Sequence, residues 1–213
     1  YMPYNFTVGP GGRTLYFTSL KSPDKTTSML LEEANIWSVT LQDDGWTEPV
    51  MLGPSINTEQ YSENYPAVAR DGTIYYMSRR EDSLGKTDIY RSPNLDGKYG
   101  KAENIGHPVN SVESDQDPFI APDGSYLIVC LTGRRDSLGG YDVYVSFPID
   151  DGSWTEPVNL GAGVNSPVSE FRPYVTADGK YLFFTRPEPQ NDNDGGIFWV
   201  SAESIGRFES DTR

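Results

Sequence analysis

The chain has 213 residues, which is enough for one or two domains with a sizeable core. Its 13% aromatic content, 21 Gly and 16 Pro favour many short strands with tight turns over long helices. The formal net charge of −14, with no Lys/Arg cluster, argues against nucleic acid as a partner. Such a surface would attract basic peptides or divalent ions, although solubility alone is its more common explanation.

The single cysteine and the hydropathy pattern give little support for special chemistry. Cys130 lies in the apolar run 126–131 and is expected to be a small buried core residue rather than a nucleophile. No stretch approaches the ~18 apolar residues of a membrane span, and no signal peptide is visible. Because the chain opens at Tyr1 rather than Met, we expect that an upstream segment is missing.

One motif recurs four times along the chain: an extended segment, a tight Asp-Gly or Gly-Gly turn, and a second strand. The copies span residues 5–16, 65–76, 117–128 and 172–183. Their turn glycines, at 12, 72, 124 and 179, are 52 to 60 residues apart. Asp-Gly supplies the positive φ of a two-residue hairpin turn, so Gly72, Gly124 and Gly179 are predicted to adopt it. Each copy therefore predicts two antiparallel strands.

Two further strands complete each repeat. Alternating segments at 35–40, 88–92, 142–146 and 196–201 predict third strands. Short segments at 46–53, 99–106 and 154–161 predict outer edge strands, and the first and last of them have a proline in the middle. Four strands per repeat at this period predict an all-β fold, a β-propeller of four-stranded antiparallel blades. Four blades, approximately 1–53, 54–106, 107–161 and 162–213, form a single domain. Its inter-blade core is expected to include Val68, Ile74, Tyr76, Ile120, Leu127, Val129, Val175, Leu182 and Phe184.

The Asp-Gly hairpin, the Asp88-Ile-Tyr90 and Asp142-Val-Tyr144 strands, and the repeated Trp-Thr-Glu-Pro-Val segment resemble the bacterial WD-repeat-like propellers of TolB type. The resemblance covers essentially the whole chain. It implies a ring of five or six blades that lacks an N-terminal blade here, with a closed four-bladed ring as the alternative. It also implies a bacterial protein of the periplasm or the outer surface.

Several repeated residues are interpreted as structural. Asp88 and Asp142 open two third strands and are expected to accept loop N–H groups or to pair with an arginine, with a repeated ligand surface as the alternative. Asn35 and Gly196 replace this aspartate in the outer copies, which weakens the idea of a four-fold ligand site. Trp46 and Trp154 are expected to pack between blades rather than to stack on carbohydrate.

The strongest candidate binding site lies just before the first strand of three repeats. It consists of the pairs Ser62-Glu63, Ser114-Asp115 and Ser169-Glu170, each at the same distance from the repeat proline. Repeat symmetry predicts that the carboxylates ring one channel mouth and hold a cation or a basic peptide. The favoured alternative is that each pair caps a turn and hydrogen-bonds the neighbouring blade.

Other candidate sites are weak. His107 is the only histidine and is expected to be an exposed loop residue rather than a metal ligand. Residues 190–195 resemble half of a calcium loop but carry Gln190 at the first ligand position, so a polar hairpin loop is favoured. No cofactor is expected, calcium being the one candidate ion.

The preferred function is therefore non-catalytic: a binding or scaffold propeller of the bacterial cell envelope. It would bind a protein, peptide or glycan partner at its channel face. The alternative is a propeller-fold lyase or hydrolase acting on glycans or peptides. Catalysis needs convergent His, Cys or paired acidic residues, and no such set stands outside the repeat motif.

Overall fold

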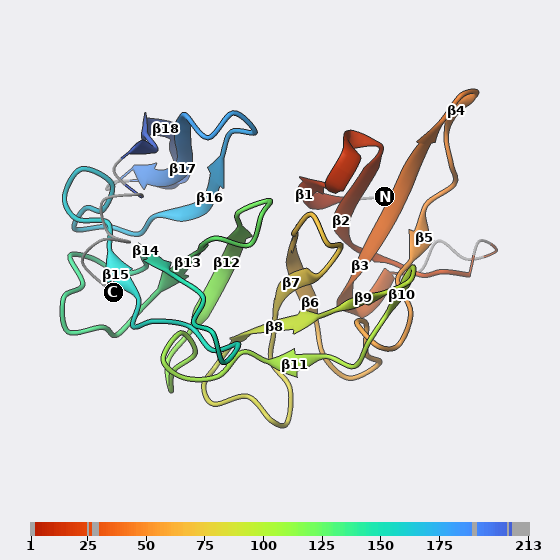
Figure 1. Ribbon diagram of the computed structural model, residues 1–213, viewed down its shortest axis with the longest axis horizontal. Helices are drawn as coiled ribbons and strands as arrows, with labels where there is room; N and C mark the ends of the chain where they lie inside the picture. The colour runs from red at the N-terminus through yellow and green to blue at the C-terminus, as the bar shows by residue number, and fades with distance from the viewer. Residues whose placement is uncertain (1–2, 25, 27–29, 189–190, 204, 206–213) are drawn as a thin grey trace.

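Four antiparallel sheets are arranged around a central channel as the blades of a β-propeller (Figure 1). The computed structural model describes residues 3–24, 26, 30–188, 191–203 and 205. The blades follow one another in an arc from the N-terminal strands to the C-terminal hairpin. Helix is nearly absent, and the 3-10 turn Pro10–Gly12 (η1) is the one helical element with assigned bounds in the described residues. The predicted all-β propeller is therefore confirmed.

The first two blades occupy the predicted segments. Blade 1 contains β1 (Tyr4–Val8), β2 (Thr14–Lys21), β3 (Leu30–Gln42), β4 (Gly45–Trp46) and β5 (Val50–Met51). Blade 2 contains β6 (Glu63–Val68), β7 (Ile74–Ser78), β8 (Asp88–Ser92) and β11 (Glu103–Asn104), with the small hairpin β9 (Asn94–Leu95) and β10 (Lys98–Tyr99). In both blades the first three strands pair in chain order and a two-residue strand, β5 or β11, pairs with the third.

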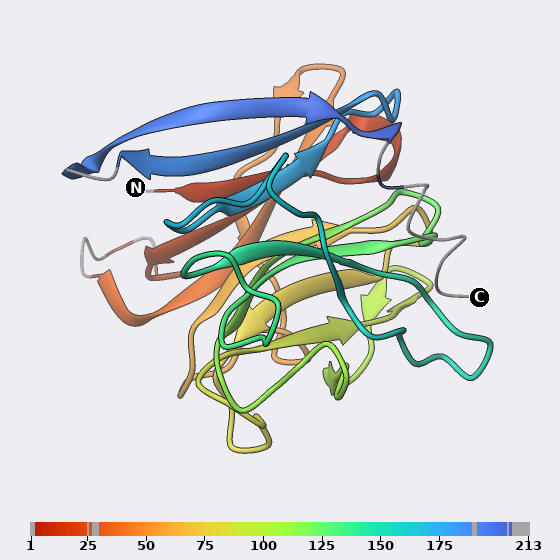
Figure 2. The same ribbon diagram turned by 90° about the vertical axis from the view of Figure 1, so that its left-hand side faces the viewer.

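Blade 3 repeats this topology, and blade 4 is a sheet of three strands in the described residues. Blade 3 contains β12 (Asp115–Ile120), β13 (Leu127–Leu131), β14 (Asp142–Ser146) and β15 (Val158–Asn159). Blade 4 contains β16 (Phe171–Val175), β17 (Tyr181–Glu188) and β18 (Asn191–Ser201). Figure 2 shows the long β17–β18 hairpin at one edge of the molecule. The fourth strands are shorter than predicted, with two residues each. In blades 1 and 3 a proline, Pro49 or Pro157, directly precedes the strand and lacks the N–H that would extend the ladder.

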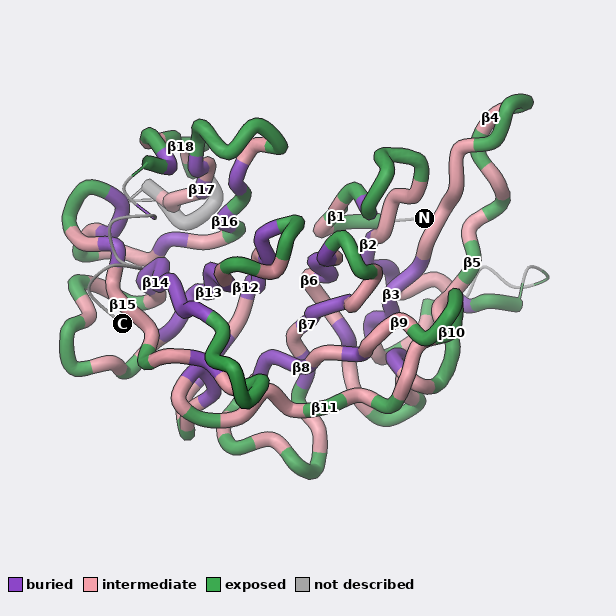
Figure 3. Tube along the Cα trace, viewed as in Figure 1, coloured by how far each residue is buried: buried purple, intermediate pink, exposed green. Residues whose placement is uncertain are grey.

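The core lies between the faces of successive blades (Figure 3). Alternating strand residues pack there, since every second side chain faces the neighbouring sheet. Eight of the nine predicted core residues are buried, and Val68 is half-buried against the same core. The predicted strand register is therefore correct. Cys130 is fully buried in this core, as expected.

The first strand of each blade is innermost. β1 lies beside β6, β6 beside β12, and β12 beside β16, and all four line one central cavity. The hairpin turns that follow them hold Gly72, Gly124 and Gly179 at φ of 86°, 76° and 70°. The predicted left-handed turn geometry is therefore confirmed, and it fixes where each inner strand ends.

Adjacent blades are joined by a repeated asparagine. The side chain of Asn110 accepts the Ile89 N–H (2.9 Å) and donates to the Ile89 carbonyl (2.8 Å), so it pairs with the backbone of β8 as another strand would. Asn57 makes the same pair of bonds with Ile36 in blade 1, and Asn165 does so with Val143 in blade 3. All three asparagines are buried and stand four residues after a glycine. This Gly-x-x-x-Asn repeat went unrecognised in the sequence.

The loop aspartates have the predicted role. Asp88 accepts the N–H groups of Leu84 (2.7 Å) and Gly85 (3.2 Å), and Asp142 accepts those of Leu138 (2.5 Å) and Gly139 (3.2 Å). Both aspartates are fully buried. The near-identical loops therefore meet a shared backbone requirement, because each aspartate satisfies the N–H groups of its own turn.

The two repeated tryptophans differ. Trp154 is buried and meets Tyr75 of blade 2 edge to face, with ring centroids 6.2 Å apart, as expected for inter-blade packing. Trp46 is 55% exposed, so the same prediction is wrong for blade 1. The reason is that β4 turns back on β3 beyond the rest of the sheet, where no neighbouring blade covers the ring.

Candidate functional site

The three carboxylates predicted at the channel mouth are fully buried, and each is held by its own donors. Glu63 accepts hydrogen bonds from Thr58 N (3.0 Å), Thr58 Oγ1 (3.1 Å) and Arg80 (3.0 Å). Asp115 accepts hydrogen bonds from Ser111 N (2.6 Å) and Oγ (3.2 Å) and lies 3.9 Å from Arg134. Glu170 accepts hydrogen bonds from Ser166 N (3.2 Å) and Oγ (2.5 Å) and from Arg186 (2.7 Å). Burial raises the pKa of Glu63 to about 7, that of Asp115 to about 6, and that of Glu170, against the opposing hydrogen bonds and arginines. Each carboxylate thus anchors an inter-blade turn.

Two of the paired serines contact the preceding blade through their side chains. Ser62 donates to Glu33 and accepts the Ala34 N–H (3.0 Å), and Ser169 accepts the Tyr141 N–H (3.1 Å). Ser114 is buried and bridges to Thr87 in a parallel pair. These residues stand at the junctions between blades.

The structure does not bring the three carboxylates together. Within the described residues no hydrogen bond or ion pair joins two of them, and no group of three His, Cys, Asp or Glu residues could hold a metal ion. A common cation site formed by these carboxylates is therefore not supported, and the binding of a basic peptide at this end of the channel stays a prediction. Charged groups with local donors are more stable buried at blade junctions than clustered at a common site.

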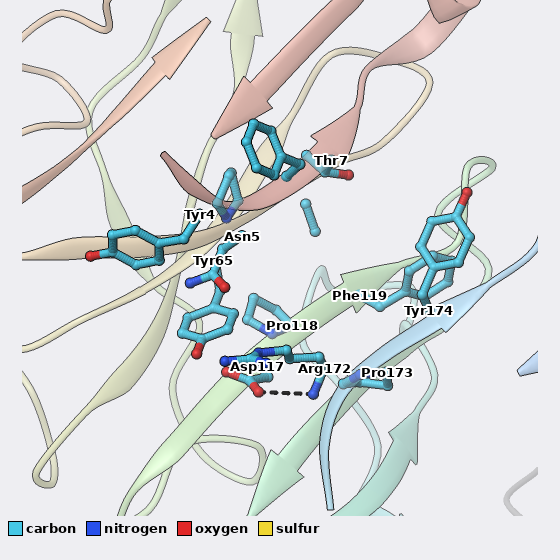
Figure 4. Close-up of a pocket in the computed structure, with 13 residues that line it drawn as sticks. Tyr4, Asn5, Thr7, Tyr65, Asp117, Pro118, Phe119, Arg172, Pro173 and Tyr174 are labelled. Carbon is cyan, nitrogen blue, oxygen red and sulfur yellow. Dashed lines mark hydrogen bonds between the residues drawn. The ribbon is translucent and has the colours of Figure 1, made fainter. Parts of the chain in front are cut away.

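A cavity lies two residues further along the same strands, in the central channel. It has a volume of about 440 Å³ and is lined by all four inner strands, β1, β6, β12 and β16 (Figure 4). A second cavity of about 420 Å³ adjoins it and shares Thr7, Ala67, Phe119 and Tyr174 with it. Each volume lies in the range typical of small-molecule sites.

Four equivalent residues carry the chemistry of this cavity. Asn5, Tyr65, Asp117 and Arg172 each follow the second or first residue of an inner strand, at a break in its pairing register. All four have left-handed φ values, of 53°, 55°, 52° and 56°. Non-glycine residues rarely adopt this conformation, and such bulges redirect side chains, often next to active sites. The bulge presents one variable side chain per blade to the channel.

Asp117 is the carboxylate of the cavity. It is 2% exposed, and its Oδ2 accepts the backbone N–H of Arg172 at 2.9 Å. Burial raises the pKa of Asp117 to about 6, while that hydrogen bond and the positive charge of Arg172 oppose the shift. A carboxyl group with this pKa exchanges a proton near neutral pH, as a general acid or base requires.

Two buried polar atoms at the cavity form no hydrogen bond of standard geometry with the described residues, although the Asn5 side chain lies close enough to Tyr65 to lower the pKa of that phenol. They are Oδ1 of Asp117 and Nδ2 of Asn5, one acceptor and one donor. Buried groups of this kind are rare in folded proteins and call for an explanation. A ligand hydroxyl can both donate and accept, so it would satisfy either atom.

Tyrosine and phenylalanine side chains surround these polar groups. Tyr65 is half-buried, and burial followed by the charge of Asp117 raises its pKa, while Arg172 and Asn5 oppose the rise. Tyr4, Phe6 and Tyr174 are exposed in the cavity, and Tyr174 meets Phe119 edge to face at 5.7 Å. Exposed aromatic rings around a few polar groups are typical of ligand sites.

The sequence contained a signal for this site. The four residues occupy the first position of the repeated motif, where the side chain changes between amide, phenol, carboxylate and guanidinium. A position that served packing alone would keep one type. The bulge that turns these side chains into the channel does not show in a period-two pattern, which predicts an ordinary strand position there.

The two weaker candidates lie elsewhere. His107 is exposed in the loop between blades 2 and 3, as expected. Residues 191–195 belong to β18 rather than to a loop, and Gln190 lies outside the described residues. No helix of the described chain is long and apolar enough to span a membrane.

No protein-family model and no curated protein matches this chain. Among solved structures it is similar to a glycoside hydrolase, with a TM-score of 0.56 at 14% identity over 95% of this chain and 68% of that one. It is also similar to a puromycin-hydrolyzing peptidase of Mycobacterium tuberculosis (TM-score 0.52, 14% identity, 95% and 27% covered) and to the Hadza microbial sialidase Hz136 (0.50, 13%, 95% and 46%). The chain thus spans less than half the length of the peptidase and of the sialidase. At these identities the likeness shows the propeller fold.

Proposed function

We propose that this propeller acts on glycans in its central channel, as a hydrolase with Asp117 as the proton donor. The observation that carries the proposal is the set of four left-handed positions, which presents Asn5, Tyr65, Asp117 and Arg172 to one cavity. Backbone strain at equivalent positions, combined with unlike side chains, indicates selection for a site rather than for packing. The similarity to hydrolases of propeller fold is consistent with it and supports an enzyme over a pure scaffold.

The chemistry follows from the environment of Asp117. In its protonated form the carboxyl would donate its proton to the glycosidic oxygen while the C–O bond breaks, and water would complete the hydrolysis. The aromatic rings of Phe119 and Tyr174 would pack against the apolar faces of the sugar rings. Sugar hydroxyls would satisfy the unpartnered atoms of Asp117 and Asn5.

Release of reducing ends from a set of bacterial and plant polysaccharides tests this function. Asp117→Asn keeps the acceptor for the Arg172 N–H and fits the left-handed backbone, so it should fold normally. Loss of the proton donor should lower the rate about 100-fold or more. Asp123→Asn is the control, because Asp123 is an exposed turn residue outside both channel cavities. Equal rates for wild type and Asp117→Asn would sink the assignment.

Glycan binding without cleavage is the second candidate, and one observation favours it. Most glycosidases use two carboxylates, whereas Asp117 is the only carboxylate among the described residues that line the two channel cavities. In that case the same oligosaccharides would bind, Asp117→Asn would weaken binding, and no product would form. A location in the bacterial envelope remains a prediction from the resemblance to TolB.

A further inference from the structure

The charges that line the channel differ in sign from those of the whole chain. The chain has a formal net charge of −14, yet the charged residues lining the two channel cavities are Arg172 and Arg70 with Asp117. The channel lining is therefore net positive by one charge. A positive channel inside an acidic protein would attract an anionic ligand.

Arg172 is available to a ligand. Three other arginines each face a buried carboxylate: Arg80 and Arg134, which follow the second strands of blades 2 and 3, and Arg186 in β17. Arg172 is exposed, and among the described residues its guanidinium forms no ion pair within 4 Å, although it lies close enough to Tyr65 and Asp117 to lower their pKa values. It contributes its backbone N–H, not its side chain, to the hydrogen bond with Asp117.

The rest of the channel fits a chain of sugar units. Arg70 lines the second cavity, so the two guanidinium groups belong to adjoining cavities that share Phe119 and Tyr174. Arg70 also lines a third cavity together with Asp123, and it is close enough to Asp123 to lower the pKa of that carboxyl group. Aromatic rings thus stand between two cationic positions.

We infer that the channel binds an acidic oligosaccharide, one whose sugars carry carboxylate groups. A sugar carboxylate is held by the planar fork of Arg172, since guanidinium and carboxylate groups match in a bidentate pair. Neighbouring hydroxyls bind Asp117 Oδ1 and Asn5 Nδ2, and a second acidic unit reaches Arg70. The inference rests on the proposed function and names its substrate class.

An array of matched glycan pairs tests it. Each pair differs only in the acidic group: an oligouronate against the corresponding neutral oligohexose, and a sialylated glycan against its desialylated form. Wild type should bind the acidic members only, and binding should weaken as NaCl rises. Calorimetry with the best acidic member should then show an affinity about 10- to 100-fold lower for Arg172→Gln, the value expected for loss of a charge-assisted pair.

Three variants distinguish the effect of the Arg172 charge, the effect of its guanidinium geometry and a general effect on folding. Arg135→Gln is the matched control, because Arg135 is exposed and lines neither channel cavity, and it should bind like wild type. Arg172→Lys keeps the charge but loses the fork and should bind with intermediate affinity. Equal binding of neutral members, or unchanged affinity in Arg172→Gln, would overturn the acidic-ligand inference and leave the proposed function standing. Wild type that binds no glycan would overturn both.

Discussion

Asp117 shows how one residue combines a structural and a chemical role. Its Oδ2 holds the backbone of Arg172 across the junction of blades 3 and 4, while its Oδ1 has no partner among the described residues. The first contact fixes the carboxyl group in place. The second leaves one oxygen for a ligand, which is the arrangement a preorganised general acid requires.

The pH dependence of activity follows from this carboxyl group. A general acid must be protonated, and burial raises the pKa of Asp117 to about 6. The protonated fraction therefore falls roughly tenfold per pH unit above that value, and kcat/KM should fall with it. A rate profile between pH 4.5 and 8 measures this. Asp117→Asn should remove that limb, and a wild-type profile flat to pH 8 would exclude Asp117 as the acid.

The elements are joined by contacts that repeat from blade to blade. A side chain at Gly85 would collide with the backbone carbonyls of Ser111 and Glu113 in the next blade. The glycine thus allows the loop of blade 2 to lie directly against the turn that precedes β12. Gly139 has the same relation to Ser166 and Val168 in blade 4.

Gly85→Ala should therefore separate the two blades locally. We expect the free energy of unfolding to fall by about 2 kcal/mol, the usual scale for a forced backbone shift in a packed contact. Urea denaturation measures this. Gly53→Ala is the control, because no atom lies within 4 Å of a side chain at Gly53, and it should leave stability nearly unchanged. Equal stability of both variants would show that the blade junction can adapt.

The asparagine contact between β8 and the following turn should be equally sensitive. Asn110→Ala leaves the buried N–H and carbonyl of Ile89 without their side-chain partner, which should cost about 2–3 kcal/mol of unfolding free energy. Val112→Ala, in the same loop and 75% exposed, should cost little. A thermal melt of the two variants compares them. Similar melting temperatures would mean that water replaces the asparagine.

At the scale of the elements, the sequence predicted most of the fold and little of the channel. Repeated turns and period-two strands determine the four blades, because these signals are local and occur in every copy. The bulges at Tyr65 and Asp117 leave no such local signal. Glu63 and Asp115 are repeated acidic residues and predict a site, yet each accepts a hydrogen bond from a backbone N–H of its own turn. The repeated acidic residues therefore predict a site two residues before the positions that line the cavity.

The whole molecule carries several buried carboxyl groups with raised pKa values. These are Glu63, at about 7, Asp115 and Asp117, at about 6, and Glu170. In each case burial favours the neutral form over the charged form. The folded state therefore holds protons that the unfolded chain releases at lower pH.

Stability should consequently decrease as pH rises. Between about pH 4 and pH 7 the folded state binds more protons than the unfolded state, so the free energy of unfolding falls through this window and levels off above it. Exposed turn carboxylates such as Asp123 have lowered pKa values and act below this window. Urea midpoints at pH 5, 6, 7 and 8 measure the effect, and Asp117→Asn should reduce the slope. A midpoint that increases with pH would contradict the assignment.

The left-handed bulges have a consequence for how such a protein can diversify. The left-handed conformation at Asn5, Tyr65, Asp117 and Arg172 disfavours β-branched residues and favours glycine, asparagine and aspartate. Each of the four positions can therefore vary among a limited set of residue types while the propeller backbone stays the same. Ligand preference in propellers of this design would change through substitutions at these four positions, without changes in the hairpin turns or the blade junctions.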